Sequence, residues 1–142
     1  MSKITRIMVD MSAPLIHHGH IRLLKKAAKF GEVVVGLSSD KDILKYKGYI
    51  PELNFRQRKE IISSIKYVGS VVKVNYHVDE KDLKKHNIDL LVHGTDNFNK
   101  VKKKKLKIFN RTPGISSSLL RIKASNNIKL KKRKFVSWAI FW

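Results

Sequence analysis

The chain has 142 residues, enough for one domain with its own core and too few for two ordinary domains. It contains no cysteine, which excludes disulfides, thiolate catalysis and cysteine-ligated zinc. The net charge of +20 favours a polyanionic partner such as a nucleotide, a nucleic acid or an anionic membrane surface. Lysine far outnumbers arginine and the aromatic residues do not form a stacking platform, so nucleic acid is not predicted as the substrate.

The hydrophobic fraction of 42% is typical of a folded globular chain rather than a disordered one. The first ten residues lack the pattern of a secretory signal, and no run approaches the roughly 18 apolar residues of a membrane span. We therefore expect a cytoplasmic protein.

Apolar runs alternate with amphipathic stretches along the chain. The apolar runs predict five buried strands, at residues 4–9, 33–37, 71–74, 90–92 and 106–109. The amphipathic stretches predict four helices, at residues 21–30, after Asn54, at 79–86 and opening at 116–123. Asn54 followed by Gln57 has the pattern of a capping box. The stretch 38–53 is expected to be a long polar loop.

This alternation of strands and helices predicts an α/β fold, a single Rossmann-like three-layer domain with a central parallel sheet of about five strands. The strands are apolar throughout, as in a sheet that helices cover on both faces. In such sheets ligands bind beyond the carboxyl ends of the strands. The loops 11–19, 93–96 and 110–115 would all open at that edge.

We expect the domain to span residues 1–124 and residues 125–142 to form a tail. The tail combines a basic cluster at 129–134 with the aromatic and apolar stretch 135–142. Such a segment can make weak contact with an anionic membrane surface, or it can pack on its own domain or on a second copy. The sequence leaves these alternatives open.

The first candidate site is the segment His17-His18-Gly19-His20, which follows a strand and a loop and precedes a helix. The amino end of a helix favours a phosphate, and Gly19 lets the backbone approach a ligand closely. Two imidazoles can donate hydrogen bonds to oxygens that gain charge as a phosphoanhydride breaks. Metal binding needs a third protein ligand, and no such partner stands nearby, so no protein metal site is predicted.

The second candidate site is the segment 111–118, with the sequence Arg-Thr-Pro-Gly-Ile-Ser-Ser-Ser. Its glycine frees a turn, its three serines open a helix and supply donors to a polyphosphate, and Arg111 adds a permanent cation. A serine run at a helix start is by itself more often a cap than a site. It gains weight because it would lie at the same edge of the sheet as the histidines.

Together these segments resemble the cytidylyltransferase family of the HxGH nucleotidyltransferase superfamily, which includes glycerol-3-phosphate, choline-phosphate, ethanolamine-phosphate and aminoethylphosphonate cytidylyltransferases. The resemblance runs from about residue 4 to residue 123 and includes the stretches 30–36, 58–68 and 93–96. Several matching segments in the same order are far more specific than any one of them.

The resemblance implies that CTP and a small phosphate or phosphonate monoester react to give a CDP-linked product and pyrophosphate. The acceptor oxygen would attack the α-phosphorus in line, without a covalent enzyme intermediate. Mg²⁺ would be held mainly by the triphosphate and water. The resemblance also implies a homodimer.

The resemblance further assigns roles to individual residues. The catalytic group would be His17, His20, Lys47 and Arg111. The nucleotide would be bound by Gly19, Gly94, Asp96, Thr112, Gly114, Ile115, Ser116, Ser117 and Ser118. The acceptor would be bound by Lys47 and Arg58, and the loop alignment leaves Lys45 as an alternative to Lys47.

The chain departs from the family pattern in four places. Pro14 stands where an acidic residue is usual, and Thr95 and Asn97 interrupt the usual Gly-Asp-Asp-Trp. The segment 97–110 is short and carries a lysine run where the family has a helix, and Pro113 replaces a commonly acidic residue. These departures leave the identity of the acceptor open.

Two alternatives remain at this point. The first is an adenylyltransferase of the same superfamily. The signature of those enzymes, Ile-Ser-Ser-x-x-x-Arg, also fits residues 115–121. The second is a non-catalytic, nucleic-acid-binding descendant, which the charge and the departures would suit.

Overall fold

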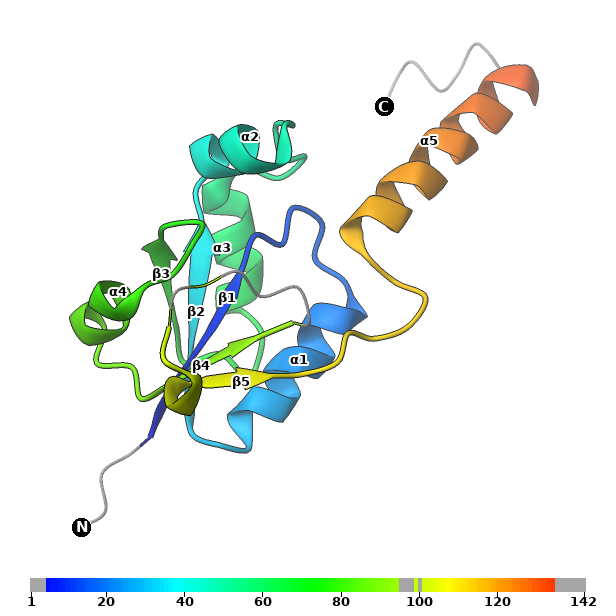
Figure 1. Ribbon diagram of the computed structural model, residues 1–142. Coiled ribbons are helices and arrows are strands. Elements are labelled where there is room, and N and C mark those ends of the chain that lie inside the picture. Colours follow the sequence, from blue (N-terminus) through cyan, green and yellow to red (C-terminus); the bar gives the residue numbers. More distant parts are fainter. Residues whose placement is uncertain (1–4, 95–98, 100, 135–142) are drawn as a thin grey trace.

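The computed structural model describes residues 5–94, 99 and 101–134. Within these residues the strands are β1 (Arg6–Met11), β2 (Glu32–Ser38), β3 (Ser70–Val74), β4 (Leu90–His93) and β5 (Leu106–Ile108). The helices are α1 (His18–Ala28), α2 (Asp40–Lys47), α3 (Phe55–Ser63), α4 (Glu80–Lys85) and α5 (Ser117–Lys134), with a short 3-10 helix at Lys103–Lys105. Figure 1 shows their arrangement.

The strands form one parallel sheet in the order β3-β2-β1-β4-β5. The central strand β1 pairs with β2 on one side and with β4 on the other, so Val9 lies between Val35 and Val92. The chain therefore changes direction across the sheet between β1 and β4, which is the place where ligands bind in open α/β sheets. The predicted Rossmann-like fold is confirmed.

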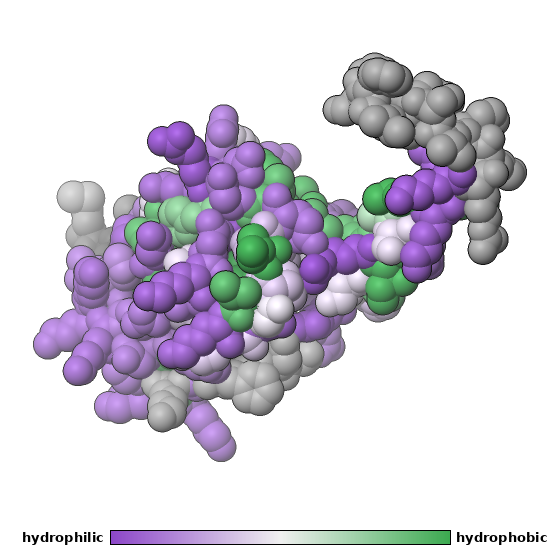
Figure 2. All heavy atoms as spheres, turned by 90° about the horizontal axis from the view of Figure 1, so that it is seen from above, coloured by the Kyte–Doolittle hydropathy of each residue, from purple (hydrophilic) through white to green (hydrophobic). Residues whose placement is uncertain are grey.

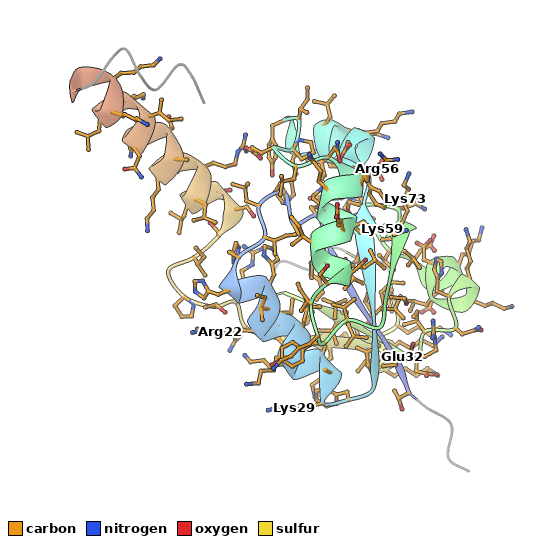
Figure 3. All side chains as sticks on the ribbon, turned by 180° about the vertical axis from the view of Figure 1, so that it is seen from behind. Arg22, Lys29, Glu32, Arg56, Lys59 and Lys73 are labelled. Atoms are coloured by element: carbon orange, nitrogen blue, oxygen red, sulfur yellow. The ribbon has the colours of Figure 1, made fainter. Side chains whose placement is uncertain are left out.

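Helices cover the sheet on both faces, and the alternation of residues along β1 shows how. Ile7 and Val9 are fully buried on the face packed against Leu24 of α1 and Ile62 of α3. Met8 points to the opposite face, where the core includes residues of α4 and of the segment after β3. Figure 3 shows charged side chains, among them Arg22 on α1 and Lys59 on α3, on the outer side of the first helical layer.

Helix α2 contradicts the long polar loop that the sequence predicts at 38–53. Ser39 caps its amino end by accepting a hydrogen bond from the Asp42 N–H at 3.1 Å, and Gly48 ends it in the left-handed region with φ 79°. Only Ile43 is buried, so the helix lacks the apolar stripe that reveals helices in a sequence. In the sequence, only the capping residues Ser39 and Gly48 indicate where this helix begins and ends.

Helix boundaries otherwise differ by a few residues from those predicted. The capping box of Asn54 and Gln57 is confirmed, and so is the short charged helix that Asp79 opens and His86 closes. Helix α1 begins three residues earlier than predicted, because His17 caps it.

Helix α5 runs continuously past the predicted domain boundary at residues 124 and 125 and projects from the body of the molecule (Figures 1 and 2). The surface of this helix mixes apolar and basic residues, and Ile122, Ile128 and Leu130 are more than half exposed. In the part of the chain that the structure describes, no helix is long and apolar enough to cross a bilayer. The separate tail at 125–142 stays a prediction.

Candidate active site

His17 and His20 form a capping box at the amino end of α1, in which each side chain accepts a hydrogen bond from a backbone N–H. His17 Nδ1 accepts a hydrogen bond from the Gly19 N–H at 3.1 Å, and His20 Nδ1 accepts one from the His17 N–H at 3.1 Å. A neutral imidazole that accepts at Nδ1 carries its proton on Nε2. Each ring can therefore donate a hydrogen bond to a ligand from Nε2, and the backbone N–H groups fix this tautomer.

Gly19 is required by the histidine turn itself. A Cβ atom at this position would lie 2.8 Å from Cε1 of His17 and 3.3 Å from a methyl group of Ile115. Any larger residue would displace the His17 ring or push away the loop that precedes α5. The sequence predicted that Gly19 gives room to the nucleotide, and the structure shows that it gives room to the histidine.

Both histidines are held in the neutral form. Burial is the main cause that lowers the pKa of His20 to about 3, and the charges of His17, Lys47 and Arg111 lower it further. Burial, followed by the charge of His18, also lowers the pKa of His17. Near neutral pH each ring is therefore a neutral donor among cations.

The histidines face a pocket of about 280 Å³ at the carboxyl ends of the strands. The predicted site residues that line it are His17, Gly19, His20, Lys47, Gly94, Arg111, Thr112, Ile115, Ser116, Ser117 and Ser118. These residues come from the start of α1, the end of α2, the end of β4 and the segment that leads into α5, and the fold brings these segments to one edge of the sheet (Figure 1). Pro14, which replaces the usual acidic residue, lines the same pocket.

The serine loop has both structural and pocket-facing groups. Ser116 Oγ accepts a hydrogen bond from the Leu119 N–H at 3.0 Å, which makes it a helix cap, and Ser117 Oγ donates to the Leu15 carbonyl at 3.0 Å. The second bond holds the amino end of α5 against the loop after β1. Gly114 supplies the turn with φ 76° but does not line the pocket.

The burial of Arg58 contradicts the prediction that this residue binds the acceptor. Its side chain is fully buried, so it has no surface with which to contact a ligand in the pocket. The guanidinium donates hydrogen bonds to the carbonyls of Leu53, Ser12 and Ser38, at 3.0, 2.7 and 2.9 Å, and to Asp40 at 2.6 Å. Arg58 is therefore a structural link between the ends of β1 and β2 and the start of α2.

An acidic residue that the sequence analysis did not single out also lines the pocket. Asp10, near the carboxyl end of β1, lies 2.5 Å from His93 Nδ1 through one oxygen and accepts from the Asn99 amide at 2.8 Å through the other. His93 therefore has a buried carboxylate partner and also lines the pocket. The signal for Asp10 was its place at the end of a strand that pairs with the strand of His93.

Aromatic residues complete the pocket wall. Tyr49, Tyr76 and His77 line it, and the ring of Tyr76 stacks on Tyr46 of α2 with 4.7 Å between centroids. His77 is exposed and contributes to the rim of the pocket. The predicted nucleotide ligand Asp96 lies outside the described residues.

The donor set in this pocket suits an anion rather than a protein-bound metal. Two neutral imidazoles, Lys47, Arg111 and several hydroxyl groups face the cavity, while Asp10 is already held by His93 and Asn99. Among residues 5–94, 99 and 101–134 there is no cluster of three or more potential metal-binding histidines or carboxylates. The arrangement can bind a polyphosphate and donate hydrogen bonds to it.

Comparisons with known proteins identify the family of this chain. The profile of the family described as Cytidylyltransferase-like matches residues 14–129. A glycerol-3-phosphate cytidylyltransferase of Staphylococcus aureus is 33% identical over 82% of this chain and 92% of its own length. An ethanolamine-phosphate cytidylyltransferase of Mus musculus is 34% identical over 66% of this chain, but the match spans only 24% of that longer enzyme.

The fold also has a close solved counterpart. The crystal structure of a lipopolysaccharide core biosynthesis protein from Thermoplasma volcanium superposes with a TM-score of 0.62 and covers 78% of this chain and 98% of that one. At 23% identity this similarity concerns the fold alone.

Proposed function

Because the chain belongs to the cytidylyltransferase-like family, we propose that it transfers CMP from CTP to a small phosphate or phosphonate monoester and releases pyrophosphate. The observation that carries this proposal is the convergence of His17, His20, Lys47 and Arg111 with the serine loop in one pocket. Groups from three distant segments meet there with the polarity that a triphosphate needs.

In the proposed reaction an acceptor phosphate oxygen attacks the α-phosphorus of CTP in line, one P–O bond forms, and the bond to pyrophosphate breaks. The Nε2–H groups of His17 and His20 donate to the oxygens of the pentavalent phosphorus as their charge grows. Lys47 and Arg111 neutralise charge on the transferred and departing groups. Positioning and charge neutralisation supply the catalysis, because no protein nucleophile is required.

The rest of the serine loop would hold the β- and γ-phosphates. Thr112 and Ser116–Ser118 line the pocket beside Arg111, and the amino end of α5 adds backbone N–H donors. Mg²⁺ would be held by the triphosphate oxygens and water and not by these side chains, and it would neutralise phosphate charge there.

The pocket supports an acceptor with a cationic head group among the four that the family suggests. Tyr49 and Tyr76 line the cavity, and their aromatic faces can contact a cationic group. These features favour phosphoethanolamine, phosphocholine or aminoethylphosphonate over glycerol 3-phosphate. The chain is similar both to ethanolamine-phosphate and to glycerol-3-phosphate cytidylyltransferases, so this preference rests on the pocket alone. A homodimer remains part of this proposal.

The test is pyrophosphate release with CTP and with ATP, each offered with the four acceptors in turn. We expect release with CTP and at least one cationic acceptor, and little with ATP. Turnover with ATP alone would favour the adenylyltransferase instead. No release with either nucleotide, together with salt-dependent binding of DNA or RNA, would favour the non-catalytic descendant.

A further inference from the structure

The first turns of α5 are fastened to the segment between α2 and α3 by one arginine. The guanidinium of Arg121 forms an ion pair with Glu52, and it lies over the ring of Tyr49 with its central carbon 3.8 Å from the ring centroid. Both partners belong to the segment 48–53, which is far from α5 in the sequence. These contacts therefore join two walls of the molecule that the sheet does not join.

The two walls face each other across the pocket. Lys47 and Tyr49 line one side, and Ser117 and Ser118 at the start of α5 line the other. Arg121 lies one helical turn beyond Ser117 and is not among the lining residues. Of its two partners only Tyr49 lines the cavity, so Arg121 reaches the pocket through the Tyr49 ring and not directly.

The segment 48–53 is anchored at its far end, where Pro51 is buried and the Leu53 carbonyl accepts a hydrogen bond from Arg58 at 3.0 Å, but residues 48–50 lack such anchors. Gly48 takes the left-handed conformation with φ 79°, and a Cβ atom added there would meet no other atom within 4 Å. Ile50 is 74% exposed, so it does not anchor the segment in the core. Lys47 is the last residue of α2, so its position depends on that helix and on residues 48–50, which Arg121 tethers to α5 through Tyr49.

We propose that Arg121 is a positioning residue that holds the segment 48–53 against α5 and so keeps Lys47 beside His20 and the serine loop. This inference rests on the proposed function, in which Lys47 meets the transferred phosphate. It assigns Arg121 a role through Glu52 and Tyr49 rather than through the triphosphate. In the unliganded structure the Arg of the Ile-Ser-Ser-x-x-x-Arg pattern contacts Glu52 and Tyr49 and does not line the pocket.

Three variants test this role in steady-state kinetics: Arg121→Met, Glu52→Ala and Arg121→Lys. Arg121→Met and Glu52→Ala should each lower kcat about 10- to 100-fold, because a displaced catalytic group costs that much, while the KM for CTP changes little. Arg121→Lys should recover part of the loss, since it restores the cation. The control is Arg56→Met, an exposed arginine on α3 (Figure 3), which should leave kcat unchanged.

A double-mutant cycle with Lys47→Met isolates the positioning effect. In that background Glu52→Ala should cause no further loss, because the group that it positions is gone. If Arg121 contacted the triphosphate directly, Arg121→Met would raise the KM for CTP, and Glu52→Ala would leave kcat unchanged or raise it. Either pattern overturns the proposal, as does an additive loss in the Lys47→Met background.

A readout that needs no turnover separates this proposal from the proposed function. Amide hydrogen exchange of residues 48–53 in the full, unliganded chain should be faster in Arg121→Met and Glu52→Ala than in the wild type, and unchanged in Arg56→Met. If exchange of residues 48–53 is as slow in Arg121→Met and in Glu52→Ala as in the wild type, the tether does not exist, even if the enzyme is active. Absence of any nucleotidyl transfer in the wild type would overturn the proposed function, while the exchange result still decides whether the tether exists.

Discussion

His17 and His20 each use Nδ1 as an acceptor for a backbone N–H, so their chemistry is set by the local turn. The same hydrogen bonds that cap α1 leave Nε2 as the donor on each ring. Helix capping and transition-state stabilisation are therefore served by the same two side chains. An asparagine can replace a histidine in the first task but not in the second, which allows the two to be separated.

We predict that His17→Asn keeps the helix cap and loses turnover. Asparagine is a good N-cap, so the melting temperature should change little. The Nε2 donor is removed, and kcat should fall by about 100- to 1,000-fold, as when an oxyanion donor is lost. Thermal melting and pyrophosphate release on the same samples check both parts. An unchanged kcat would show that His17 serves the cap alone.

The lowered pKa of His20 predicts a pH-dependent stability. The unfolded chain protonates this histidine near pH 6.5, whereas the folded chain resists protonation down to about 3. Stability should therefore be full above pH 6.5 and should fall as the pH drops from 6.5 toward 3. Urea unfolding at a series of pH values should show a shallower fall in His20→Gln than in the wild type. Equal slopes would contradict the shift.

At the scale of elements, α3 is joined to the carboxyl ends of β1 and β2 by a single buried arginine. Arg58 satisfies carbonyls of Ser12, Ser38 and Leu53 and meets Asp40 at the start of α2. Ser12, Ser38 and Lys47 of these elements line the pocket, so Arg58 supports the site without lining it. The sequence shows an arginine on a helix and gives no sign that its partners are distant backbone carbonyls.

We predict that Arg58→Met destabilises the fold by about 3–5 kcal/mol, because buried carbonyls lose their donors. Asp40→Asn should cost less, since the Asp40 side chain is 41% exposed and the carbonyl bonds remain. Urea denaturation measures both. A loss from Asp40→Asn that equals the loss from Arg58→Met would mean that the ion pair, and not the carbonyl bonds, carries the stabilisation.

At the scale of the whole molecule, the buried core belongs to the sheet and its covering helices. Every buried hydrophobic residue of the described chain lies between Ile7 and Val92, and the outer part of α5 adds none. We therefore expect a chain that ends at residue 124 to fold with a melting temperature close to that of the full chain. Thermal melting followed by circular dichroism checks this; a drop of many degrees would show that α5 supports the core.

Most of the fold could be predicted because strand and helix periodicity is a local property of the sequence. Ile7 and Val9 lie in an apolar run that predicts a strand, and Leu24 lies in an amphipathic stretch that predicts a helix. The parallel topology follows from the alternation of strands and helices along the chain. Helix α2 could not be predicted in this way, since only Ile43 is buried and its caps were the only signal. The site was found through two segments with distinctive chemistry. Asp10 and Tyr49 were missed because their partners come from distant segments.

The central claim is that the His17–His20 turn and the serine loop together transfer CMP to a phosphomonoester. The most direct measurement is ³¹P NMR of a reaction with CTP, Mg²⁺ and phosphoethanolamine, run with the wild type and with His17→Asn. We predict equal amounts of a CDP-linked diphosphate and pyrophosphate from the wild type and almost none from the variant. Product formed equally by both proteins, or release of pyrophosphate with free CMP and no diphosphate product, would contradict the account.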